Sequence, residues 1–346
     1  MSIGAAEISP GTHCQRTAQD ANWDAPFLFL PALRKKASIM PNPTKPRILC
    51  VGALTMDTIF RLDRLPPGPG KFIPVEALQI AAGMASSAAA SIARLGGGVS
   101  LWASIGDDDI GRRVVEDLTA EGVDCSSVRR IDAARSAFSS IFVDAAGERM
   151  IVPFYDAALL TAPQIMPPIA EGAYDVVMTD VRWPLAAAQA LKAARGAGVH
   201  GVLDADTAPL ETLEMLLPLA SHIVASEPAA EQVTGESDPE RATVALAALY
   251  GRDGAFIAVT GGDKGCFWYD ALEGEVRNMP AFAVDVVDTL AAGDVFHGVF
   301  AWALSRGHPT YQIMRFASAA AAIKCSRFGG RRGAPTKSEL EAFLTR

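Results

Sequence analysis

Residues 174–206 read "YDVVMTDVRWPLAAAQALKAARGAGVHGVLDAD" and contain two apolar runs on either side of an Ala-rich segment. The runs "YDVVMTDV" and "GVHGVLDAD" are short and almost continuously apolar, which is typical of strands buried on both faces. The segment "PLAAAQALKAARGAG" between them has a helical period and ends in Gly, as a helix C-terminus does. This order of strand, helix and strand predicts two parallel strands joined by a right-handed crossover.

The same alternation begins at "RILCVGAL", residues 47–54, and continues along the chain. Further apolar runs such as "GVSLWASIG", "SHIVASE" and "GAFIAVTGG" alternate with helical segments such as "MASSAAASIARLGG" and "PERATVALAALYGRDG". A sheet with two apolar faces must be covered by helices on both sides. We therefore expect a three-layer α/β/α fold with a mainly parallel sheet and a ligand site at the carboxyl ends of its strands.

Two segments interrupt this alternation and predict a small separate β-sheet. Residues 58–80 alternate in polarity around a "PPGPG" turn, and residues 136–154 read as a hairpin across "DAAGE". Such a sheet is well placed to act as a lid over a ligand. Residues 1–45 show little periodicity and are expected to form a poorly ordered extension, so the folded domain is expected to span residues 46–346.

Composition narrows the class of partner. The chain has 31 Lys and Arg against 39 Asp and Glu, a formal charge of -8, so nothing global attracts it to nucleic acid or an acidic membrane. Its five cysteines have no CxxC spacing and imply neither a disulfide framework nor a zinc site. The apolar run at 27–33 precedes its basic cluster, unlike a signal peptide, and no run approaches a membrane span of about 18 residues. We expect a cytoplasmic protein with a small-molecule ligand.

The segment "DTLAAGD", residues 288–294, directly precedes the apolar helical run "VFHGVFAWAL". Its small side chains leave backbone N–H groups accessible at a helix N-terminus, which attracts anions such as phosphate. Asp294 would repel a phosphate, so it either caps the helix or accepts a proton from a substrate hydroxyl. His297, inside the first turn of that helix, is expected to pack or hydrogen-bond locally.

"DTLAAGD" resembles the D-T-x-G/A-A-G-D signature of the PfkB (ribokinase-like) carbohydrate kinases, and the resemblance extends over residues 46–340. It implies a ribokinase-like fold and transfer of the γ-phosphoryl group of ATP to a primary sugar hydroxyl, with Mg²⁺ as cofactor. It also implies that Asp294 is the catalytic base. The residues that it assigns to the anion hole are Ala291, Ala292 and Gly293.

Two further motifs of the resemblance imply contacts with the sugar. Asp57 in "GALTMD" matches the acid that binds sugar hydroxyls in this family. The family's Gly-Gly-x-x-A-N element is present as "AGMASS", which places Gly83 and Ser87 beside the sugar. Ala82 replaces the first Gly of this element, and Ser87 replaces its Asn.

The nucleotide side is implied by two other motifs. "VTGGDKG" resembles the family's T-x-G-x-x-G turn. The residues that this turn assigns to ATP are Thr260, Gly262 and Gly265. The N-x-x-E element linked to magnesium is present as "SEPA", with Ser226 for Asn and Ala229 for Glu, which leaves Glu227 as the acid nearby. Asp288 is the candidate ligand for a monovalent cation such as K⁺, and the basic loop "RFGGRRG" either lies near such a cation or is exposed.

Several strings, including "DVRW" at residues 180–183, look most like the branch of the family that contains 6-deoxy-6-sulfofructose kinase. An anionic ketose of this kind needs a positive partner, for which Arg182 and Lys71 are the candidates. Pro153 stands about where that branch carries a polar sulfonate contact, and proline offers no N–H. The resemblance therefore leaves the identity of the sugar open.

Three alternatives to a sulfofructose kinase stay open at this stage. A ribokinase-like enzyme or a nucleoside kinase would have the same fold and the same signature. A non-catalytic regulator that binds sugar or nucleotide is favoured by the altered "AGMASS" and "SEPA" elements. In all three cases a homodimer through the lid is expected, since lid sheets of this family can pair between subunits and exposed sheet edges need covering.

Overall fold

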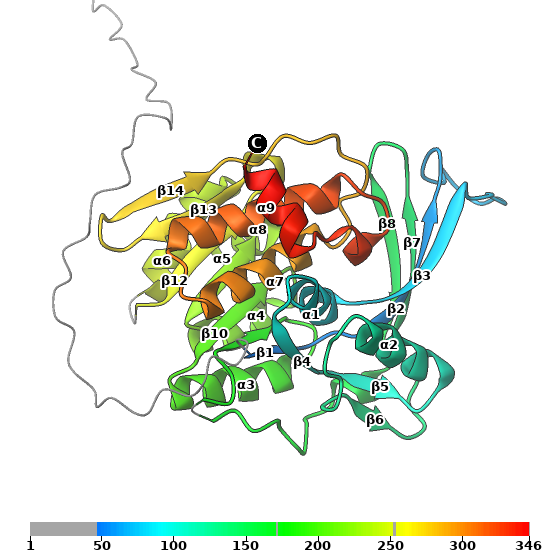
Figure 1. The fold of residues 1–346 in the computed structure, drawn as a ribbon, viewed down its shortest axis with the longest axis horizontal. Helices are drawn as coiled ribbons and strands as arrows, with labels where there is room; N and C mark the ends of the chain where they lie inside the picture. The colour runs from blue at the N-terminus through cyan, green and yellow to red at the C-terminus, as the bar shows by residue number, and fades with distance from the viewer. Residues whose placement is uncertain (1–46, 171, 252–253, 346) are drawn as a thin grey trace, which may run out of the picture. The chain divides into compact units, whose positions relative to one another are not determined.

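The computed structural model describes residues 47–170, 172–251 and 254–345. The chain divides into two units, residues 1–44 and 45–346, and all of the described residues belong to the second unit. The extension predicted at residues 1–45 lies outside the described residues. Within the second unit the chain forms one large sheet covered by helices and one smaller sheet (Figure 1).

The large sheet is mainly parallel, which confirms the predicted fold class. Its eight strands, in spatial order, are β14 (Glu275–Met279), β13 (Cys266–Asp270), β12 (Phe256–Thr260), β11 (His222–Ser226), β10 (His200–Ala205), β9 (Val176–Thr179), β1 (Arg47–Val51) and β4 (Gly98–Trp102). From β4 to β12 every neighbouring pair is parallel, whereas β13 and β14 are added antiparallel at one edge. The carboxyl ends of the six parallel strands therefore meet at one edge of the sheet.

Alternate residues of the central strands are buried on opposite faces of the sheet. In β1, Ile48 and Cys50 belong to one apolar cluster, whereas Leu49 and Val51 belong to another. One face is covered by α1 (Met84–Arg94), α7 (Ala292–Ser305) and α8 (Thr310–Cys325), with α9 (Lys337–Leu344) packed on α8. The other face is covered by α3 (Pro184–Ala197), α4 (Leu210–Leu216), α5 (Glu227–Thr234) and α6 (Pro239–Tyr250).

A second, four-stranded sheet confirms the predicted small separate sheet. Its strands, in spatial order, are β3 (Glu76–Ala82), β2 (Thr55–Arg61), β7 (Phe138–Val143) and β8 (Arg149–Phe154). β7 and β8 form an antiparallel hairpin, and β8 lies at the edge with Met150, Ile151 and Val152 exposed by 42, 43 and 57%. Next to this sheet lie α2 (Asp109–Ala120) and a pair of short parallel strands, β5 (Ser104–Gly106) and β6 (Arg129–Ile131).

A close contact at the end of β1 fixes the connection between the two sheets. Gly52 has φ 148°, and a Cβ atom there would lie 2.1 Å from Oδ1 of Asp180, the buried residue that follows β9. The Asp180 carboxylate accepts hydrogen bonds from the N–H groups of Ala53 (2.8 Å), Ala85 (3.0 Å) and Arg182 (2.8 Å). One carboxylate thus holds together the start of the small sheet, the first turn of α1 and the loop that carries Arg182.

α7 is positioned by its apolar composition. It packs between α1 and α8 with nine consecutive residues buried, from Val295 to Ala303. A Cβ atom at Gly298 would lie 2.6 Å from the carbonyl oxygen of Ala88, so glycine permits the close approach of α7 to α1. Among the described residues no helix, α7 included, is long and apolar enough to cross a membrane.

Candidate active site

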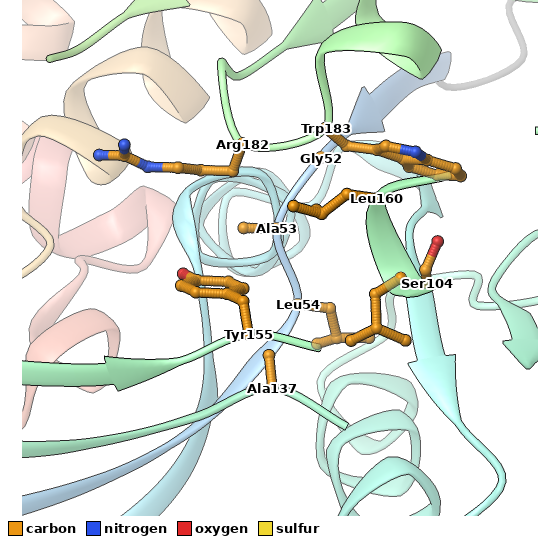
Figure 2. Close-up of a pocket in the computed structure, with 10 residues that line it drawn as sticks. Gly52, Ala53, Leu54, Ser104, Ala137, Tyr155, Leu160, Arg182 and Trp183 are labelled. Atoms are coloured by element: carbon orange, nitrogen blue, oxygen red, sulfur yellow. The ribbon is translucent and has the colours of Figure 1, made fainter. Parts of the chain in front are cut away.

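A cleft lies where the small sheet faces the carboxyl ends of the parallel strands. Its cavity of ≈ 380 Å³ is within the usual size range of small-molecule sites. The cleft brings together six of the predicted site residues, Asp57, Gly83, Ser87, Arg182, Ala291 and Asp294. Tyr155 and Arg182 also border a smaller hollow next to the cleft, and Figure 2 shows their side chains extending to the same side, away from Trp183.

The N-terminus of α7 forms a set of unbonded donors on the wall of this cleft. Ala291 is the N-cap and has the left-handed φ of 62°, which is rare for a residue other than glycine. Among the described residues no acceptor is recorded for the N–H groups of Ala291, Gly293 and Asp294. The Ala292 N–H is the exception to the predicted anion hole, because it donates to the Thr289 carbonyl (3.2 Å). Three donors and the helix dipole remain available for an anion.

The Asp294 carboxylate is partly exposed at the same wall and is not the helix cap, since the N-cap is Ala291. In the described part of the chain it has no recorded hydrogen-bond partner. Burial raises the pKa of Asp294 well above its usual range, and the negative charge of Asp204 raises this pKa further, whereas His297 lowers it. A carboxylate that has lost water and gained no donor is a stronger proton acceptor.

Beneath Asp294 lies a buried pair, Asp204 and His297. The His297 ring contacts the Gly293 carbonyl through Nδ1 (2.7 Å) and the Val224 carbonyl through Nε2 (3.1 Å), which confirms that it hydrogen-bonds locally. Its Nε2 also lies 3.4 Å from Oδ1 of Asp204. Burial raises the pKa of Asp204 and lowers that of His297. The pair therefore holds the first turn of α7 against the ends of β10 and β11.

The opposite wall presents the predicted sugar-binding groups. Asp57 on β2 is buried and accepts a hydrogen bond from Thr55 Oγ1 (2.9 Å), and burial raises the pKa of Asp57. Gly83 is the N-cap of α1 with φ 106°, and a Cβ atom there would lie 2.7 Å from the Ala53 carbonyl. The Ser87 hydroxyl is buried and has no hydrogen-bond partner in the described residues, so it is available to a ligand.

The two predicted cationic groups have different positions. Arg182 lines the cleft, but its guanidinium is paired with Asp206 (2.9 Å) and donates to the Thr207 carbonyl (2.8 Å). Lys71 lies exposed in the connection between β2 and β3 and is not one of the residues that line the cleft. The structure therefore places Arg182, but not Lys71, in the lining of the cleft, and leaves neither side chain as an unpaired positive charge there.

Comparison with known proteins assigns the chain that forms this cleft to a family. The model of the pfkB family carbohydrate kinases matches residues 45–337. The chain belongs to this family. It is 30% identical to a ribokinase of Haemophilus influenzae over 80% of this chain and 91% of that protein. It is 29% identical to a fructokinase of Klebsiella pneumoniae over 82% of this chain and 96% of that protein.

Solved structures agree with this assignment. A protein of Agrobacterium tumefaciens provisionally described as a ribokinase is 47% identical and superposes with a TM-score of 0.84, over 87% of this chain and 98% of that one. A ribokinase of Thermotoga maritima is 26% identical with a TM-score of 0.73, over 88% of this chain and all (100%) of that one. The chain is therefore a carbohydrate kinase that transfers a phosphoryl group to a sugar hydroxyl.

The predicted nucleotide-side residues of this kinase lie at the ends of β11 and β12. Glu227, the first residue of α5, forms an ion pair with Lys264 in the turn between β12 and β13. The Thr260 hydroxyl donates to the Ala225 carbonyl (3.3 Å), which joins the two strand ends. Gly262 is exposed with φ 60°, and a Cβ atom there would meet open space. By contrast, Gly265 is required by packing, since its Cβ would lie 2.1 Å from the Met279 carbonyl.

The residues present fit a magnesium ion that is carried mainly by a nucleotide. In the described ranges no group of three or more His, Cys, Asp or Glu side chains is arranged to hold a metal. Mg²⁺ in kinase sites needs only one or two carboxylates in addition to phosphates and water. The Asp206 carboxylate accepts from Ser226 Oγ (3.0 Å), and Glu227 is the residue after Ser226. These two acids would hold such an ion in exchange for their present partners, Arg182 and Lys264.

Asp288, the predicted ligand of a monovalent cation, already accepts hydrogen bonds from protein donors at both of its carboxylate oxygens. Its Oδ1 accepts from the N–H of Leu290 (2.8 Å), and its Oδ2 accepts from the N–H groups of Gly329 (3.0 Å) and Gly330 (2.9 Å). The ammonium group of Lys324 lies 3.1 Å from the same Oδ2. Sequence reasoning missed Lys324 because it stands in an Ala-rich helical segment where lysine is usually exposed.

Arg149, at the start of β8, is a second residue that sequence reasoning missed. Its side chain lines the cleft and donates to the Thr289 hydroxyl, next to the unbonded donors of α7. Three arginines line the cleft, and the other two are paired with acids: Arg182 with Asp206, and Arg331 with Asp117 and Glu121. No acidic partner of Arg149 is recorded among the described residues. The signal was its place in the sequence, directly after the predicted "DAAGE" turn of the lid hairpin.

Proposed function

We propose that this kinase uses ATP to phosphorylate the primary hydroxyl group of a small monosaccharide, with Asp294 as the general base. The observation that supports this most is the Asp294 carboxylate in the cleft, beside the unbonded N–H groups of α7. An alcohol held between them would lose its proton to Asp294 while the N–H groups of Ala291 and Gly293 stabilise charge on the transferred phosphoryl group.

The sugar would lie between the small sheet and α1. With its primary hydroxyl directed at Asp294, its other hydroxyls can donate to Asp57 and bond with the unpartnered hydroxyl of Ser87. The positive φ at Gly83 turns the chain tightly at the start of α1, next to the same space. These groups orient the sugar, and orientation of the attacking oxygen supplies a large part of catalysis in phosphoryl transfer.

The phosphoryl group would arrive from the opposite side, where ATP extends along Thr260, Gly262, Gly265 and Glu227. Mg²⁺ bound with the nucleotide supplies positive charge that neutralises its phosphates. Arg149 supplies a further positive charge from the lid, next to Thr289. Closure of the small sheet would bring Arg149 and Asp57 onto the substrates and exclude water, which limits wasteful hydrolysis of ATP.

A neutral sugar fits the charges of the cleft best. Arg182 and Arg331 are already neutralised by acids, and the third arginine, Arg149, lies beside Thr289 on the side of the phosphoryl group. Asp57 and Asp294 add negative charge to the walls. Two relatives, a ribokinase and a fructokinase, are named for neutral sugars with a primary hydroxyl, whereas a third is named as an ATP-dependent ribose-1-phosphate kinase, whose substrate is anionic. A pentose or ketohexose is therefore the substrate class that we propose.

An anionic ketose such as 6-deoxy-6-sulfofructose is the second candidate, favoured by the position of Arg182 in the lining of the cleft. Its sulfonate would have to replace Asp206 on the Arg182 guanidinium, since the two groups are 2.9 Å apart. Pro153 lines the same cleft and offers no N–H donor for the sulfonate.

Self-association through the small sheet is also part of the proposal. β8 is an edge strand, and its exposed Met150 and Val152, which lie on one face of the strand, form an apolar stripe that a second copy of the sheet would cover. Measurement of molecular mass in solution tests this, and Val152→Lys is expected to give the monomer.

Release of ADP tests the proposed function. Purified protein with ATP and Mg²⁺ is offered ribose, fructose, fructose 6-phosphate, sulfofructose and nucleosides, with Arg182→Ala as the variant and the exposed Arg112→Ala as the matched control. We expect turnover of a neutral sugar that Arg182→Ala changes little. Turnover restricted to anionic sugars and lost in Arg182→Ala would assign the second candidate. Stabilisation by sugar without ADP release from any of them would contradict catalysis.

A further inference from the structure

Lys324, on α8, is fully buried with 0% exposure, which is rare for lysine. Its ammonium group donates to the carbonyl oxygen of Asp288, lies 3.1 Å from the Asp288 carboxylate, and is 3.4 Å from the carbonyl oxygen of Arg327. The charge is thus surrounded by one carboxylate and two carbonyl oxygens. Oxygen ligands of this kind also bind hard metal cations.

This ammonium group lies directly behind the anion-binding turn of the cleft. The Asp288 carboxylate that it contacts accepts from the N–H of Leu290 on one side, and from those of Gly329 and Gly330 on the other. Leu290, Ala291 and Gly330 all line the cleft. Lys324 and Asp288 therefore join the turn that carries the unbonded donors to the neighbouring wall.

A free monovalent cation does not fit the same place. Such an ion would need the Asp288 carboxylate and the carbonyl oxygens that already surround the Lys324 ammonium. An ion from solution and the Lys324 ammonium group would then both contact Asp288 and would repel each other strongly in this buried site. The single negative charge of Asp288 does not offset two positive charges. The environment of Asp288 is therefore complete without an ion from solution.

We propose that the Lys324 ammonium group serves as a built-in cation, which positions the anion-binding turn and makes turnover independent of monovalent cations in solution. Lys324 is a positioning residue, because it acts on the substrates through Asp288 and Leu290 and does not line the cleft. The part of this proposal that concerns turnover rests on the proposed kinase function.

The first test uses the unchanged protein. ADP release and thermal stability are measured in potassium, sodium and tetramethylammonium chloride at equal ionic strength. We expect turnover to agree within about twofold in the three salts, since screening is then equal and no site selects among the ions. A tenfold or larger requirement for potassium would overturn the proposal.

The second test separates Lys324 from a site that needs no cation at all. Lys324→Ala removes the charge and leaves space, whereas Lys324→Met removes the charge and fills the space. We expect Lys324→Ala to lose about 10²-fold in turnover in tetramethylammonium, as misplaced catalytic groups do, and to regain part of it in potassium or ammonium. Lys324→Met is expected to lose activity without recovery, and Lys337→Ala, an exposed control on α9, to behave as the unchanged protein.

The unfolding temperature tests the role of Lys324 separately from the proposed kinase function. If the Lys324 ammonium replaces an ion, potassium should raise the unfolding temperature of Lys324→Ala and leave that of the unchanged protein constant. This holds even if no sugar is phosphorylated, in which case the proposed function fails alone. Full turnover of either variant in tetramethylammonium would overturn the role of Lys324. If neither variant folds, a potassium requirement of the unchanged protein would still overturn the proposal.

Discussion

Asp288 and Asp294 begin and end the same segment, yet the structure places them in opposite environments. Asp288 is 0% exposed, and both of its carboxylate oxygens accept hydrogen bonds, one of them beside the Lys324 ammonium. Asp294 faces the cleft, and no donor to its carboxylate is recorded within the described residues. Two identical side chains six positions apart are thus distinguished only by what surrounds them.

The difference shows how one short turn can be both rigid and reactive. A carboxylate whose hydrogen bonds are complete stabilises the chain around it, whereas one that has lost water without gaining donors is ready to accept a proton. The rigid end holds the donors of Ala291 and Gly293 at the reactive end. Substitutions at the two acids should therefore fail in different ways.

Asp294→Asn should give the largest effect, because it removes the proposed proton acceptor and keeps the shape of the side chain. We expect turnover to fall by about 10²–10⁴-fold with the fold intact. ADP release with the best sugar measures the loss, and a thermal scan measures stability. Near-normal turnover of this variant would show that Asp294 is not the proton acceptor, and the proposed difference in function between Asp294 and Asp288 would be wrong.

Asp288→Asn should lower the stability of the protein, in contrast to Asp294→Asn, which should lower its turnover. It leaves the buried Lys324 ammonium without its counter-charge, for which the expected cost is about 3–5 kcal/mol of stability. Urea unfolding followed by tryptophan fluorescence measures this cost. Asp285→Asn, at an exposed position three residues earlier, is the matched control and should change stability little.

Arg149→Ala tests whether the lid contributes a charge to the reactive end. A charge-assisted hydrogen bond contributes about 1.5–3 kcal/mol, so the expected loss of turnover is roughly 10–10²-fold. Arg149→Lys should recover part of it, and the exposed Arg112→Ala should have no effect. A change in the KM for sugar with constant kcat would instead show that Arg149 binds the sugar and not the phosphoryl group.

The smallest effect concerns pH. Burial raises the pKa of Asp294 in the folded protein above its unfolded value, so both states are protonated at low pH and the carboxyl then contributes nothing. As pH rises, the unfolded state ionises first, and Asp294 destabilises the native state. The gain in unfolding temperature from Asp294→Asn should therefore increase as pH rises from the pKa of the unfolded state through the raised pKa of the folded state. A gain that decreases over this range would contradict the raised pKa.

Much of the fold could be predicted because its causes are local. Short apolar runs and Gly-terminated helical segments are periodic features, and the sequence shows them directly, as in residues 174–206. The small sheet was found in the same way, from the alternation around "DAAGE". Residues 267–269 were predicted as strand residues, but the antiparallel pairing of β13 and β14 was not, since it depends on which edge of the sheet is open.

The candidate site was predicted where a motif carries the chemistry, and was missed where chemistry depends on distant partners. Asp294, Asp57 and Ser87 belong to short motifs, and the structure brings all three to one cleft. The ion pair of Arg182 joins residues 24 positions apart, and that of Lys324 joins residues 36 positions apart. Neither spacing gives a sequence pattern. The structure was therefore needed to identify Arg149 as the arginine of the cleft without an acidic partner among the described residues.

The contact between Gly52 and Asp180 limits how this protein can diverge. Any side chain at position 52 would overlap the Asp180 carboxylate, and any shorter residue at position 180 would abandon three backbone donors. Neither position can change first without harm to the loops beside the cleft. Descendants of this sequence should therefore inherit the two residues together, even in lineages whose sugar preference has shifted.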